Sequence, residues 1–71
     1  MIKIGKKGKI IKGEELGNYI LIQDDKENSG GYLILLKDET LDRGFDYWVE
    51  NYEMLEKFFD QSQWVVDWLK D

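Results

Sequence analysis

Two apolar segments separated by a polar loop constrain the fold of this chain more than any other feature of its sequence. Residues 16–25 (LGNYILIQDD) and 31–38 (GYLILLKD) are rich in β-branched and aromatic residues, and DDKENSGG at residues 24–31 is a strong turn signal. Two such segments around a short glycine-containing loop are typical of a β-hairpin. The sequence therefore predicts an antiparallel sheet organised around this hairpin.

Short strands are also expected before the hairpin. Residues 1–5 (MIKIG) alternate between apolar and polar side chains, and residues 8–13 (GKIIKG) hold two isoleucines between lysines. The glycines in both segments favour short strands that bend rather than long continuous ones. The N-terminal part therefore predicts two short strands that contain lysine.

After the hairpin, the pattern predicts an extended segment followed by a helix. Residues 45–50 (FDYWVE) alternate like a strand, although Trp48 also lies at helical spacing from Tyr52, so the pattern alone leaves strand and helix open. Asn51 is a favourable N-cap. We therefore expect residues 45–50 to be extended and the helix to run from Tyr52 to about Gln61. This helix is expected to bury Leu55, Phe58 and Phe59.

The last segment, residues 63–69 (QWVVDWL), fits a strand better than a continued helix because it is rich in β-branched and aromatic residues. It places Trp64, Val66 and Trp68 on one side and leaves Asp67 on the other, where we expect its carboxylate to face solvent. The pattern does not decide whether the two tryptophans are buried or exposed.

Together these elements predict an α+β fold, with a small antiparallel β-sheet or a partly open barrel of about five strands and one short helix before the last strand. A chain of 71 residues is expected to form a single domain, residues 1–71. Because the chain has no cysteine, its stability must come from three Trp, four Tyr, three Phe and the aliphatic residues rather than from disulfides.

The absence of histidine and cysteine limits the chemistry of the chain. It removes the usual proton shuttle, thiol nucleophile and soft-metal ligands. The acidic loop at residues 23–28 does not follow the spacing of a calcium loop, because Lys26 stands where a second ligand is needed. Carboxylate pairs are numerous, but so small a chain has little room for a cleft that would raise the pKa of one of them. We therefore predict no enzyme activity, no catalytic or metal site and no cofactor.

Charge is distributed unevenly along the chain. Residues 1–12 carry five lysines and no acid, whereas residues 13–71 carry fifteen acids and five bases. An acidic surface attracts basic partners over long distances. Our leading hypothesis is a non-catalytic protein-binding module, such as an inhibitor, that covers a basic protein partner with the second-half acids. The candidate protein-binding residues are Asp42, Asp46, Glu50, Glu53, Glu56 and Asp60, of which the last three share one helix face.

Two alternatives remain open. A small barrel that binds nucleic acid could use Lys6, Lys7 and Lys9, although a net charge of −5 makes this partner less favourable. The same lysines would also protect an edge strand from pairing with other chains. Alternatively, an apolar surface that contains Trp64 and Trp68 would make a structural homodimer, so the sequence is compatible with a monomer or a homodimer.

The stretches GGYLIL (residues 30–35), FDYWVENYEMLEKFF (45–59) and SQWVVDWL (62–69) resemble those of small uncharacterised bacterial proteins, some of which resemble toxin-immunity proteins. This resemblance implies a small protein that neutralises a toxin by binding to it, and it carries no catalytic residue. The sequence has no apolar stretch long enough for a signal peptide or a membrane span, so we expect a cytoplasmic protein without membrane contact.

Overall fold

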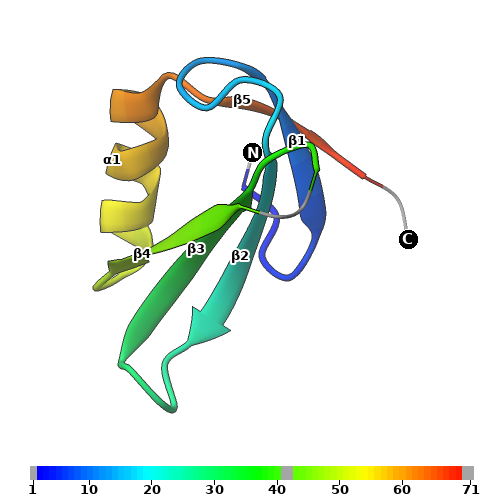
Figure 1. Ribbon diagram of the computed structural model, residues 1–71. Helices are drawn as coiled ribbons and strands as arrows, with labels where there is room; N and C mark the ends of the chain where they lie inside the picture. Colours follow the sequence, from blue (N-terminus) through cyan, green and yellow to red (C-terminus); the bar gives the residue numbers. More distant parts are fainter. Residues whose placement is uncertain (1, 41–42, 70–71) are drawn as a thin grey trace.

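The computed structural model describes residues 2–40 and 43–69, which form a five-stranded sheet and one helix (Figure 1). In chain order the elements are β1 (Lys7–Lys12), β2 (Tyr19–Asp25), β3 (Gly31–Lys37), β4 (Gly44–Val49), α1 (Tyr52–Ser62) and β5 (Val65–Trp68). The predicted α+β class, with one helix before the last strand, is confirmed. In the described part of the chain, no helix is long and apolar enough to cross a membrane.

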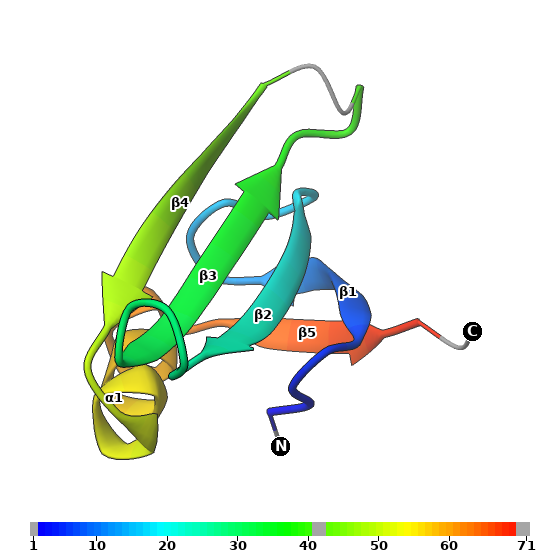
Figure 2. The ribbon, with the colours of Figure 1, turned by 90° about the horizontal axis from the view of Figure 1, so that it is seen from below.

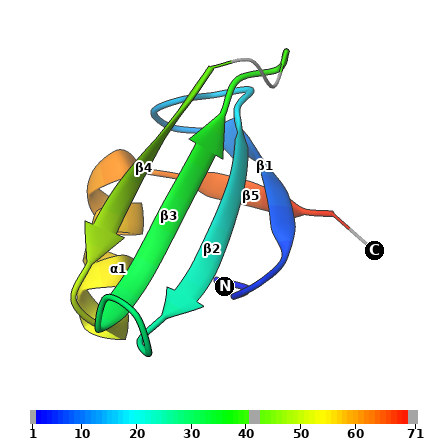
Figure 3. The same ribbon diagram turned by 60° about the horizontal axis from the view of Figure 1, so that its bottom comes forward.

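The strands form one antiparallel sheet in the order β4-β3-β2-β1-β5, so β4 and β5 are its edges. The predicted hairpin consists of β2 and β3, which pair from Tyr19 opposite Lys37 to Asp25 opposite Gly31. The sheet twists strongly, so that β5 runs across the direction of β3 and β4 (Figure 2). Helix α1 lies on one side of the sheet, behind β4 in the view of Figure 3.

Alternation along the strands gives the sheet two different faces. Ile20 and Ile22 of β2 and Ile34 of β3 are at most 1% exposed and belong to the same core cluster as Leu55 of α1. We call the face that carries them the inner face. The outer face carries the alternate residues, such as Leu35, which are only partly buried. The core therefore lies between the inner face and α1.

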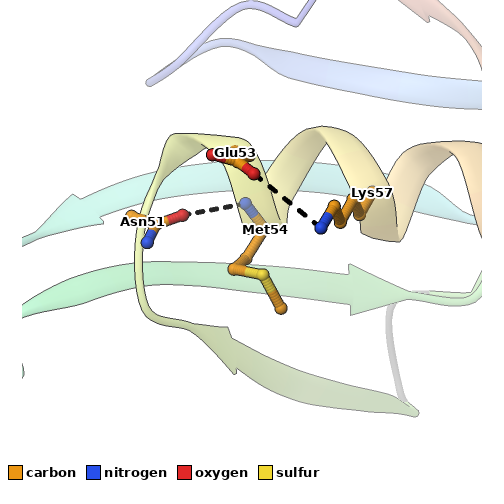
Figure 4. A network of polar contacts seen from close by, with 4 residues as sticks. All are labelled: Asn51, Glu53, Met54 and Lys57. Carbon is orange, nitrogen blue, oxygen red and sulfur yellow. Dashed lines mark hydrogen bonds and ion pairs between the residues drawn. The ribbon is translucent and has the colours of Figure 1, made fainter.

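Local signals fix both ends of α1. The side chain of Asn51 accepts a hydrogen bond from the backbone N–H of Met54 at 2.9 Å, which confirms the predicted N-cap (Figure 4). Gln63 ends the helix in the left-handed conformation, with φ of 56°, and its N–H donates to the carbonyl groups of Asp60 and Phe59. Leu55 is fully buried as predicted, whereas Phe58 and Phe59 are only partly buried.

Of the two predicted N-terminal strands, the one at residues 8–13 is confirmed as β1, whereas the one at residues 1–5 was wrong. Residues 2–5 are not a strand, and Met1 lies outside the described residues. Gly5 has a φ of 79°, a conformation that breaks a strand, and its N–H donates to the carbonyl oxygen of Ile22 at 2.7 Å. The segment therefore forms a turn that leads into β1, whose two edges are already taken by β2 and β5.

The structure shows which residues are extended on either side of α1. Residues 44–49 are strand β4, which confirms that the chain stays extended before the helix. The last strand is shorter than residues 63–69, because the left-handed Gln63 belongs to the end of the helix. Asp67 is exposed, as expected for the solvent side of β5.

Candidate functional site

Three of the predicted protein-binding acids lie together on α1. Glu53, Glu56 and Asp60 are all exposed and follow the i, i+3, i+7 spacing of one helix face. A weak ion pair joins Glu53 to Lys57, with 3.8 Å between Oε1 and Nζ, and both side chains are well exposed (Figure 4). Exposed pairs of this kind contribute little to stability. These acids are therefore available to a partner.

Two of these acids border a hollow between α1 and β5. The hollow has a volume of about 350 Å³ and combines two carboxylates with aromatic and aliphatic side chains. Its lining residues are Ile2, Glu56, Phe59, Asp60, Trp64, Val65, Val66 and Trp68. We call it the acidic-aromatic hollow. It lies between the acidic face of α1 and the aromatic residues Trp64 and Trp68.

Ring contacts and a hydrogen bond of Trp64 hold the aromatic lining of this hollow in place. The ring of Phe59 lies edge-on to Trp64, with 5.0 Å between centroids, and stacks on Trp68 at 6.4 Å. Trp64 is 8% exposed, and its Nε1 donates to the carbonyl oxygen of Glu14 at 2.6 Å. Trp64 is thus a core residue, whereas Trp68 is partly exposed at the hollow.

Asp46 and Glu50 do not line the acidic-aromatic hollow. Asp46 pairs with Leu35 across β3 and β4 and therefore lies on the outer face, away from the helix. Glu50 is exposed in the connection between β4 and α1. Asp42 lies outside the described residues. The described candidate acids therefore divide between one helix face, the connection that precedes the helix and the outer face of the sheet.

The N-terminal lysines contribute to a different surface. Lys7 and Lys9 are two positions apart on β1 and therefore lie on the same face of the sheet. Each places its Nζ 5.6 Å from the ring centroid of Tyr19. Lys37 pairs with Tyr19 from β3, so a third lysine reaches this part of the outer face. A shallow hollow of about 210 Å³ lies there, lined by Lys7, Tyr19, Ile20, Leu21, Leu35 and Lys37. Lys6 precedes β1 and does not line it.

Sequence reasoning missed Lys37 and Tyr19 as members of this lysine-rich surface. They are eighteen positions apart, and only the strand register brings them together. The hairpin had been predicted, but its register had not, and a shift of one residue would have moved Lys37 to the other face.

The acidic hairpin loop uses its own carboxylates to stabilise its turn. Asp24 accepts from the backbone N–H of Lys26 at 3.1 Å, and Asp25 accepts from the side-chain amide of Asn28 at 3.2 Å. The pKa of Lys26 is raised, first by hydrogen bonding with the Tyr32 side chain and further by attraction to Tyr32 and Asp24. Lys26 therefore stays charged at neutral pH. Among residues 2–40 and 43–69, no group of three or more acidic side chains is arranged to hold a metal ion.

Comparisons of this chain with protein-family models, with curated proteins and with solved structures found no match.

Proposed function

We propose that this chain is a non-catalytic, cytoplasmic protein-binding domain that recognises a basic segment of another protein at the acidic-aromatic hollow. An inhibitor or toxin-immunity protein that covers a basic surface of its target would act in this way. The observation that carries the proposal is the position of Glu56 and Asp60 beside the aromatic rings of Phe59 and Trp68.

A lysine or arginine side chain has the chemistry that this hollow requires. Its aliphatic stem can lie against an aromatic ring while its charged end reaches a carboxylate. A cation over an indole ring adds about 0.5–2 kcal/mol, depending on how far the pair is desolvated. Glu56 and Asp60 lie one helical turn apart and can therefore receive one or two cations. Partly buried aromatic residues are also common binding hot spots.

The charge of the whole chain supports a basic partner. Its net charge of −5 attracts a basic protein over long distances and increases the rate of encounter. We therefore expect binding to weaken as the salt concentration rises.

The lysine-rich surface supports nucleic-acid binding as a second candidate function. Lys7, Lys9 and Lys37 surround Tyr19, a ring on which a base of a single strand could stack. Three lysines can neutralise few phosphates, however, and the net negative charge of the chain repels the nucleic acid. We therefore rank this function below recognition of a basic protein.

Affinity capture from the native host tests the choice between these functions. The tagged protein is used at low and high salt, with and without nuclease. A protein that survives nuclease and is lost at high salt supports the proposal. Material that disappears with nuclease and is no longer captured after Lys7→Glu and Lys9→Glu supports the second candidate.

Matched charge reversals test the position of the site. Glu56→Lys and Asp60→Lys should each weaken capture of the partner at least tenfold, because each places a positive charge beside the bound cation. Glu27→Lys is the control, because it makes the same charge change at an exposed position of the hairpin loop. Equal losses from all three variants would show that only net charge matters and that the hollow is not the site.

A further inference from the structure

Strand β4 is an edge of the sheet. In the described part of the chain, the backbone groups of β4 that point away from β3 have no strand partner. Strand β4 pairs with β3 on one side, and none of the strands within residues 2–40 and 43–69 pairs with its other side. In Figure 3 it lies beside β3, on the side away from β2. The backbone N–H and C=O groups along such an edge can pair with another extended chain.

Within the described residues, this edge lacks several of the usual protections, although α1 packs against one face of β4. Natural edge strands are protected by lysine, proline, bulges or very short length. Strand β4 has six residues, GFDYWV, with Asp46 as their only charge, and it pairs with β3 without a register shift. The opposite edge differs, because β5 has four residues and its pairing with β1 shifts between Ile10 and Lys12.

Large apolar side chains are also exposed along β4 and at the start of α1. Phe45, Tyr47 and Trp48 are 50%, 42% and 48% exposed, and Tyr52 and Met54 follow at 40% and 42%. Phe45 and Tyr47 pair with inner-face residues of β3, and Trp48 pairs with an outer-face residue, so apolar side chains are exposed on both faces along this edge. Exposed apolar surface is typical of an interaction site.

We infer that β4 pairs with β4 of a second copy of this chain, giving an antiparallel, two-fold symmetric dimer with a continuous ten-stranded sheet. The inference is independent of the proposed function, because β4 does not line the acidic-aromatic hollow.

The two-fold symmetry determines which registers are possible. In an isologous antiparallel pair, the residue on the axis lies opposite itself, and the other residues pair symmetrically around it. An axis at Asp46 would place two aspartates together, and an axis at Trp48 would place Asp46 opposite Glu50. Like charges directly opposite each other destabilise a strand pair.

An axis at Tyr47 avoids both of these like-charge pairs, and it pairs residues 45–49 of one copy with residues 45–49 of the other. It places Tyr47 opposite Tyr47, Asp46 opposite Trp48, and Phe45 opposite Val49 of the second copy. Pairs between aromatic and β-branched residues are among the favourable cross-strand pairs. This self-complementary register is why the partner is a second copy rather than an unrelated peptide.

A single cysteine tests the register, because the chain contains no other cysteine. Directly opposite residues of an antiparallel pair have Cα atoms about 4.5–5.5 Å apart, which a disulfide can bridge. Tyr47→Cys should therefore form a covalent dimer under mild oxidation, at a rate at least tenfold above that of Val65→Cys. Val65 is 47% exposed on the other edge strand and is the matched control. Equal rates for the two variants would overturn the inference.

Sedimentation of the unmodified protein over a concentration range tests the dimer itself. Tyr47→Lys and Tyr47→Glu should each raise the dissociation constant of the dimer at least tenfold. An equimolar mixture of the two variants should restore the dimer through a Lys–Glu pair at the axis. Circular dichroism of each variant checks that it is folded. A wild-type chain that stays monomeric at millimolar concentration, or a mixture that does not recover, would overturn the inference and leave β4 to another partner.

Discussion

Replacement of Leu55 by alanine should remove a large part of the stability of this domain. Leu55 is 0% exposed, and it is the fully buried apolar residue that α1 contributes to the core. Substitutions of this kind cost about 2–5 kcal/mol, because they lose the transfer free energy and leave a cavity. Since a domain of this size is stable by about 3.5–10 kcal/mol, we expect Leu55→Ala to lose about 3 kcal/mol.

Urea unfolding followed by tryptophan fluorescence measures this loss. Trp64 is a suitable reporter because it is buried and its ring contacts Phe58 and Phe59 of α1. A loss of about 3 kcal/mol corresponds to a decrease in melting temperature of about 12–24 °C for a domain of this size. The slope of the unfolding free energy with urea should stay unchanged.

Met54→Ala is the matched control for this experiment. Met54 is the preceding residue of the same helix and is 42% exposed, so its replacement should change the unfolding free energy by less than about 1 kcal/mol. If Leu55→Ala costs no more than Met54→Ala, α1 does not pack on the inner face as described, and the reasoning is refuted.

Two further substitutions test the ends of the helix. Asn51→Ala should cost about 1 kcal/mol in thermal or urea unfolding, because it removes the side-chain acceptor for the N–H of Met54; an unchanged midpoint would mean that this cap contributes nothing. Gly13→Ala should lower the melting temperature, because Gly13 has a φ of 97° and an added Cβ would meet the backbone of Gln63 at the helix end. A Gly13→Ala protein as stable as the wild type would contradict this close approach.

The sequence predicted the elements whose signals are local. The hairpin of β2 and β3 follows from two β-rich segments around a glycine-containing loop, and α1 begins where the Asn51 cap indicated. Neither element depends on knowledge of distant contacts. The same is true of the grouping of Glu53, Glu56 and Asp60, which requires only the helical period.

The features that the sequence did not predict depend on contacts between distant residues. Trp64 is buried, and its Nε1 donates to the carbonyl oxygen of Glu14, fifty residues away. Residues 2–5 look like a strand, but Gly5 has a φ of 79° and its N–H donates to the carbonyl oxygen of Ile22, so the chain turns there. The lysine-rich surface and the separation of Asp46 from the helical acids both follow from strand register. Local pattern cannot supply the order or the register of strands.

The most direct test of the proposed site uses the indole N–H signals of the three tryptophans in NMR spectra of the labelled protein. Trp64 and Trp68 line the acidic-aromatic hollow, whereas Trp48 pairs with Leu33 on the outer face. The captured partner, or a lysine- and arginine-rich peptide from it, is titrated into the protein.

Binding at the hollow should shift the indole signal of Trp68 and the backbone amide signals of Glu56 and Asp60, and should leave the indole signal of Trp48 unchanged. Shifts confined to Trp48 and Tyr19, with Trp68 unaffected, would place the partner on the outer face and contradict the proposed function.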